Sequence, residues 1–141
     1  MSRSVTLIQM PALVLYHGTT NLIADLIDRY GFRISLAGFG PTGLIGAVFT
    51  NSIIVANAHA ASAARGKRVR PTIVFARIKP GAWANLIGLP DSQVPPMEDL
   101  LVAGVIGAIL DSSPRKEDAQ EYVLFKPGLA TPASMTGAIE P

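Results

Sequence analysis

The sequence predicts a single domain of the α+β class. Its 141 residues are enough for one hydrophobic core, and 49 % of them are apolar while 16 % are charged, which excludes intrinsic disorder. Short runs rich in Val, Ile, Leu and Phe, typical of strands, occur together with two stretches of helical pattern. No repeat and no interdomain linker interrupts them, so we treat residues 1–141 as one domain.

The first regular stretch is a predicted buried strand from Pro11 to His17, preceded by a short N-terminal arm. Thr19 or Thr20 then caps a helix whose apolar residues fall on one face with a period of about 3.6 residues, and a glycine ends it. The start of this helix places free backbone N–H groups beside His17 and Gly18. These two residues are therefore well placed to bind a polar or anionic group of a ligand.

Residues 31–46 are rich in glycine and predict a loop of about 15 residues, which is long enough to be functional. Its segment 38–43 matches GxGxxG, but a strand-like run at 44–50 follows where a dinucleotide-binding motif requires a helix. We interpret that match as accidental. An alanine-rich helix, capped within residues 50–52, is expected from Ile53 to Ala64.

A basic turn follows the second helix, with four cations within six positions: Arg65, Lys67, Arg68 and Arg70. One interpretation is a solvated helix C-terminus whose positive charges oppose the helix dipole. The other is a contact for phosphate or nucleic acid. The net charge of +2 is too small to indicate a dedicated nucleic-acid-binding protein, so both interpretations stay open.

The C-terminal half predicts three more strands and a third helix. The strands are expected at Thr72 to Ile78, Val105 to Leu110 and Tyr122 to Phe125, and the helix from Pro95 or Pro96 to about Ala103. Residues 82–96 are otherwise predicted to be irregular, with Trp83 in the core, and residues 129–141 to form a weakly patterned tail.

Three separate stretches carry chemistry-bearing motifs. They are Tyr16-His17-Gly18-Thr19, Gly46-Ala47-Val48-Phe49-Thr50 and Gln120-Glu121-Tyr122-Val123-Leu124-Phe125-Lys126-Pro127. Together and in this order they resemble the His-Tyr-Glu branch of the ADP-ribosyltransferase superfamily, which includes poly(ADP-ribose) polymerases and diphtheria-type toxins. The first is similar to that branch's His-Gly-Ser/Thr strand end, the second to its Gly-x-Tyr-Phe-Ser/Thr strand, and the third to its strand opened by a glutamate.

This resemblance implies an ADP-ribosyltransferase-like split β-sandwich with flanking helices and with NAD bound in the cleft between the sheets. It also implies transfer of ADP-ribose from NAD to a macromolecular acceptor, a protein or a nucleic acid, with release of nicotinamide. The chain resembles small bacterial or phage effectors and toxins, which would make an antitoxin or immunity protein a further expected partner.

The resemblance also assigns roles to residues. Glu121 would be the catalytic carboxylate, because cleavage of the nicotinamide–ribose bond builds an oxocarbenium-like charge that a fixed carboxylate stabilises. His17 would hold the adenosine ribose hydroxyls, and the backbone of Gly18 the nicotinamide amide. The implied catalytic residues are Glu121 and His17, and the implied NAD-binding residues are Tyr16, His17, Gly18, Thr19, Gly40, Phe49, Thr50 and His59.

Three residues depart from the family pattern. Val48 stands where a tyrosine is usual, and Ala56 where some members have a serine that binds the amide. Ala119 is not the Glu or Gln that arginine-modifying relatives have two residues before the catalytic glutamate, so arginine is not the expected acceptor. Two alternatives stay open: an NAD glycohydrolase, and a catalytically inactive module of the same fold that binds a nucleotide or a protein.

Other functional classes find no support in the sequence. Two histidines and no cysteine offer too few ligands for a metal site, and neither GxSxG nor a phosphate-binding Gly-Lys-Ser/Thr loop occurs. The longest charge-free apolar run, Leu100 to Leu110, has 11 residues, fewer than the roughly 18 that span a bilayer. No signal peptide is recognisable, and we expect a cytoplasmic protein or one delivered into a target cell.

Overall fold

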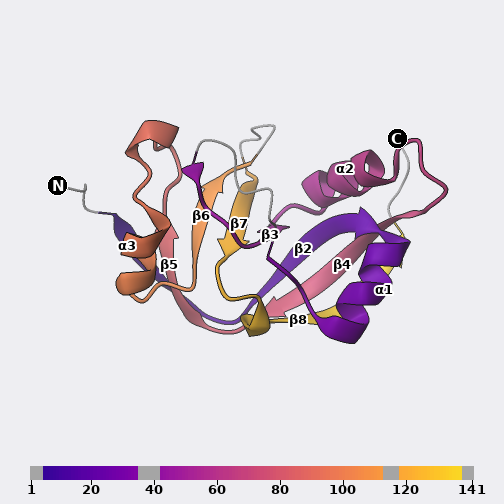
Figure 1. Cartoon of the computed structure of the whole chain (residues 1–141), viewed down its shortest axis with the longest axis horizontal. Helices are drawn as coiled ribbons and strands as arrows, with labels where there is room; N and C mark the ends of the chain where they lie inside the picture. The colour runs from indigo at the N-terminus through magenta and orange to yellow at the C-terminus, as the bar shows by residue number, and fades with distance from the viewer. Residues whose placement is uncertain (1–4, 35–41, 113–117, 138–141) are drawn as a thin grey trace.

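The computed structural model describes residues 5–34, 42–112 and 118–137. These residues form one eight-stranded sheet and three α-helices, an α+β arrangement in which only β5 and β6 pair in parallel (Figure 1). The strands are β1 (Thr6–Met10), β2 (Leu13–Thr20), β3 (Ala47–Thr50), β4 (Pro71–Ile78), β5 (Gly81–Asn85), β6 (Gly107–Asp111), β7 (Gln120–Leu124) and β8 (Ala130–Gly137). The helices are α1 (Asn21–Tyr30), α2 (Ile53–Ala64) and α3 (Met97–Val102), with short 3-10 turns at Asp91–Gln93 and Pro127–Leu129.

The sheet, whose strand order is β1-β5-β6-β7-β3-β2-β4-β8, is almost divided between β3 and β2. These two strands share one paired position, Tyr16 opposite Thr50, whereas β2 pairs with β4 along all eight of its residues. One half therefore contains β1, β5, β6, β7 and β3, and the other contains β2, β4 and β8. We call the place where the halves meet, at Tyr16 and Thr50, the seam; it lies near the middle of the view in Figure 1.

Each face of the sheet carries its own apolar core. Because successive residues of a strand point to opposite faces, β2 sends Leu15 to the face that packs against Ala24 and Ile27 of α1. The fully buried Trp83, expected in the core, belongs to the same cluster. The second cluster contains Leu100 of α3 and lies on the opposite face of the half formed by β5, β6 and β7.

Both long helices have the ends that the sequence predicts. The Thr20 hydroxyl accepts a hydrogen bond from the Ile23 N–H at 3.3 Å and begins α1, and Gly31 ends it at a φ of +83°. The Ser52 hydroxyl accepts from the Val55 N–H at 3.2 Å and begins α2. No helix in the described part of the chain is long and apolar enough to cross a membrane.

The small residues of α2 let it lie directly on β2. A Cβ added to Gly18 would collide with the carbonyl oxygen of Ala56 and come within 2.8 Å of the Ala60 nitrogen. Gly18 is therefore required for the close approach of helix and strand. Since His17 and Gly18 point to opposite faces of the strand, α1 and α2 cover opposite faces of β2 (Figure 1).

Three sequence-based expectations about strands were wrong. Residues 81–85 are not irregular but form β5, between β1 and β6. Residues 130–137 of the expected tail form β8, which pairs with the edge of β4. The strand expected to stop at His17 continues to Thr20, so His17 lies within β2 rather than at its end. In each case pairing with a strand distant in sequence, which local patterning does not reveal, extends the strand.

Candidate functional site

The three motif-bearing strands lie side by side in the sheet, in the order β7, β3, β2. Glu121 of β7 is paired with Thr50 of β3, and Thr50 is paired in turn with Tyr16 of β2. Residues paired across strands project to the same face of a sheet. The fold thus brings one residue of each motif into a single row that crosses the seam.

Glu121 is buried within this row, with an exposed fraction of 4 %. Its neighbours across the strands are Thr50 on β3 and Leu110 on β6. Glu121 is therefore not a solvated carboxylate, although it stands near the start of β7, because the strands on both sides flank it. A carboxylate shielded from bulk water interacts more strongly with nearby charge than an exposed one.

A pair of amide side chains fixes the position of β7 against β3. Asn51 Nδ2–H donates to Gln120 Oε1 at 2.6 Å, and the Gln120 backbone N–H donates to Asn51 Oδ1 at 2.8 Å. We call this the Asn51–Gln120 clamp. It follows directly on the pairing of Thr50 with Glu121 and thereby holds these two residues in register. Sequence reasoning missed it, although Gln120 belongs to the third motif, Asn51 directly follows the second, and both carry complementary amides.

His17 is oriented by the backbone of β3. Its Nδ1 lies 2.7 Å from the Val48 carbonyl oxygen, and since a carbonyl only accepts, Nδ1 carries the proton. Burial lowers the pKa of His17; the bond to Val48 opposes this effect, and the nearby His59 contributes a further lowering of the pKa. The ring is therefore neutral near pH 7, with Nε2 as a hydrogen-bond acceptor.

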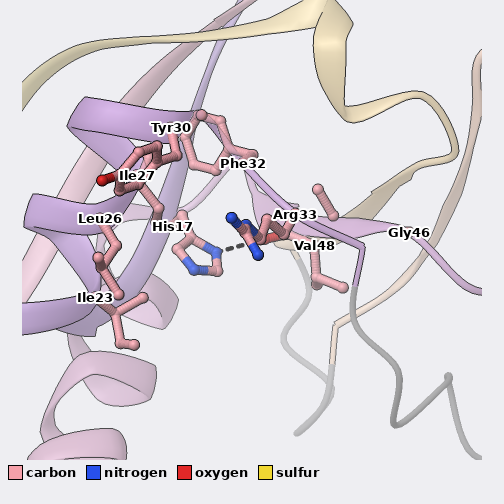
Figure 2. A pocket seen from close by; sticks show the side chains of 11 residues that line it. His17, Ile23, Leu26, Ile27, Tyr30, Phe32, Arg33, Gly46 and Val48 are labelled. Carbon is pink, nitrogen blue, oxygen red and sulfur yellow. Dashed lines mark hydrogen bonds between the residues drawn. The ribbon is translucent and has the colours of Figure 1, made fainter.

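His17 faces a cavity of about 510 Å³, within the size range of small-molecule sites (Figure 2). Side chains of α1 form one wall, and residues 46–48 form the other, as Figure 2 shows. The rings of Phe32 and Phe49 meet the His17 ring roughly edge-on. The distances from the His17 ring centroid to their ring centroids are 5.9 and 6.0 Å, respectively. The described residues that line the cavity are His17, Ile23, Leu26, Ile27, Tyr30, Gly31, Phe32, Arg33, Gly46, Ala47 and Val48.

The two residues to which the resemblance assigns catalysis do not share this cavity. Glu121 is absent from its described lining, and so are Thr19, Thr50 and His59. Tyr16 shares a row with Glu121, so His17, the next residue of β2, points to the other face of the sheet. His17 and Glu121 thus lie on opposite faces of the sheet. Gly40 lies outside the described residues.

The remaining predicted NAD-binding residues have structural contacts of their own. Phe49 is almost fully buried and packs against Phe32 at 4.9 Å between ring centroids, and the Thr50 hydroxyl accepts from the Ser52 N–H at 3.1 Å. The Tyr16 ring meets Phe75 edge-on at 5.1 Å. These residues shape the seam through packing and backbone position.

Two of the departures from the family pattern have clear structural positions. Val48 lines the cavity and supplies the carbonyl that orients His17. Ala56 is fully buried against β2, so a longer side chain at this position would enter the helix–strand interface. No protein-family model matches the chain, and no curated protein gives a significant match.

Proposed function

We propose that this protein is an NAD-dependent ADP-ribosyltransferase with the fold of that superfamily. The observation that carries the proposal is the row of Tyr16, Thr50 and Glu121, which brings together three motifs that are far apart in the sequence. A near-division of the sheet accompanies this row, in keeping with the split sandwich that the resemblance implies.

The reaction would use Glu121 as its electrostatic centre. The bond between C1′ of the ribose and the nicotinamide nitrogen breaks, and its electron pair leaves with nicotinamide. The positive charge that develops on C1′ and the ring oxygen is stabilised by the Glu121 carboxylate, which is already fixed and shielded from bulk water. An acceptor nucleophile then bonds to C1′ and gives up its proton to solvent water.

The cavity beside His17 would hold the adenosine end of NAD. Its apolar walls suit a purine ring, and the neutral His17 ring offers Nε2 as an acceptor for a ribose hydroxyl. The cavity and Glu121 lie on opposite faces of the sheet, so bound NAD would have to pass beside the Tyr16–Thr50 pair. The single pair between β2 and β3 leaves these strands free to diverge on either side of it.

The decisive experiment measures nicotinamide release from NAD, with and without macromolecular fractions of a cell lysate. Glu121→Gln keeps the shape of the side chain but removes its charge, so turnover should fall by roughly 10²–10³. Glu98→Gln makes the same chemical change at an exposed position of α3 and should leave turnover unchanged. No release by the wild-type protein under any condition, or an equal fall in both variants, would contradict the proposal.

Two alternatives have their own signatures. Release that needs no macromolecule would favour an NAD glycohydrolase, in which water is the acceptor. Val48 offers no flat ring for nicotinamide, and the buried Ala56 offers no hydroxyl, which favours a module that binds NAD without cleaving it. Calorimetric binding of NAD without any release would identify that case.

A further inference from the structure

The basic turn between α2 and β4 is a second candidate site, away from the NAD cavity. It contains Arg65, Lys67, Arg68 and Arg70, all exposed. Removing these four from the twelve basic residues of the chain leaves eight against ten acidic ones. The excess positive charge of the protein is therefore concentrated in this turn, at the end of α2 nearest the C-terminus label in Figure 1.

The dipole of α2 does not account for this cluster. Backbone groups already satisfy the carbonyls at the end of the helix, since the Arg65 N–H donates to Ser62 and the Lys67 N–H donates to Ala64. The dipole effect falls off beyond the last turn, and Lys67, Arg68 and Arg70 all lie past it. Within the described residues, none of the four forms an ion pair. Their charges are thus not neutralised within the described part of the chain.

The turn surrounds a preformed hollow of about 320 Å³. Its surface is more polar than apolar, and it is lined by Arg65, Gly66 and Lys67 together with Ala61, Ala64, Val69 and Pro71. No acidic residue occurs in the described lining. The far end of the turn is fixed by two hydrogen bonds, from the Arg70 N–H to Asn21 Oδ1 and from the Asn21 N–H to the Arg70 carbonyl. The cations are therefore presented on a constrained backbone.

We propose that this basic turn binds the phosphodiester backbone of a single-stranded nucleic acid. Four cations are more than one phosphate can pair with, whereas a strand presents phosphates at regular intervals. The hollow of about 320 Å³ beside Arg65 and Lys67 has room for a sugar or an unstacked base, and an unstacked base is offered by a single strand and not by a duplex.

The position of the turn connects it with the proposed reaction, on which this second step of the inference rests. α2 begins beside the Asn51–Gln120 clamp and ends at the basic turn, and its 12 residues span about 18 Å. A stacked strand covers that length with about five nucleotides. Because α2 carries no acidic side chain, a strand held at the turn can run along it toward Glu121. A single-stranded nucleic acid is thus the macromolecular acceptor that the structure favours.

Binding can be tested without NAD, by fluorescence anisotropy of a labelled 12-nucleotide single strand at several salt concentrations. Two variants remove charge from the turn. The first carries Lys67→Gln and Arg68→Gln, and the second carries Arg65→Gln and Arg70→Gln. The matched control carries Arg77→Gln and Lys79→Gln, which remove the same charge from exposed positions at the other end of β4. Thermal unfolding of each variant shows whether it is folded.

We expect the wild-type affinity to fall with salt with a log–log slope of about −2.8, for four phosphates neutralised. Each turn variant should bind about tenfold more weakly and flatten the slope by about 1.4, while the control retains wild-type binding. The proposal would be overturned if the wild-type protein did not bind the oligonucleotide, or if the control variant bound it as weakly as the turn variants do. It would also be overturned if polyglutamate displaced the labelled oligonucleotide as well as unlabelled oligonucleotide does.

The failure of this inference is distinguishable from that of the proposed function. Glu121→Gln should bind the oligonucleotide normally yet fail to attach ADP-ribose to it from labelled NAD. Wild-type nicotinamide release without oligonucleotide binding would refute only the role of the basic turn. Oligonucleotide binding without nicotinamide release would refute only the transferase.

Discussion

At the scale of single residues, the buried His17 ring has both a fixed orientation and a lowered pKa. The ring is held by the Val48 carbonyl, and burial in the sheet lowers its pKa below the usual 6.5. The unfolded chain therefore binds a proton at His17 at a higher pH than the folded chain does. Stability should be constant above about pH 6.5 and fall as the pH drops below it, by at most about 1.4 kcal/mol per pH unit from this group.

Urea unfolding at pH 7.5 and pH 5.5 would measure this effect. His17→Asn keeps a donor for the Val48 carbonyl but does not titrate, so it should lose less stability between the two pH values than the wild-type protein. An equal loss in both proteins would show that His17 is not the group responsible.

Gly18 shows how little space separates β2 from α2. In Gly18→Ala the new methyl group would meet the backbone of Ala56 and Ala60, which can only move together with the helix. We expect a loss of about 1–3 kcal/mol in the free energy of unfolding, the usual cost of overpacking. Gly128→Ala is the matched control, since a Cβ there meets no atom within 4 Å. Equal stabilities for the two variants would contradict the close contact.

At the scale of elements, the Asn51–Gln120 clamp acts as a positioning device for the row containing Glu121. Asn51 is exposed and Gln120 is only half-buried, so Asn51→Ala should cost only about 1 kcal/mol of stability. Small displacements of a catalytic group are costly, so under the proposed function, in which Glu121 is that group, we expect kcat for nicotinamide release to fall about tenfold with little change in KM. Asn85→Ala removes a comparable exposed bond, to the Ile87 N–H, and should leave kcat unchanged. A change in KM alone would argue against a positioning role.

At the scale of the whole molecule, the sequence predicted the helices better than the sheet. The caps Thr20 and Ser52 and the stop at Gly31 are local signals, and they set the helix ends as expected. β5 and β8 were missed, because pairing with distant strands rather than their own patterning stabilises them. The candidate site shows the same division between local and distant information. The motifs were visible, but their meeting at one row, the clamp and the walls of the His17 cavity all depend on long-range pairing.

The seam also constrains how the chain can fold. β1 belongs to one half of the sheet and β2 to the other, with only Pro11 and Ala12 between them, and the chain crosses again before β3, β4, β5 and β8. Neither half is a contiguous segment, so both need contacts between residues far apart in sequence, a topology that favours slow folding. A chain emerging from the ribosome would hold His17 long before β7 could pair with β3. The row containing Glu121, and any activity that depends on it, would appear only after β7 has been synthesised and has paired with β3.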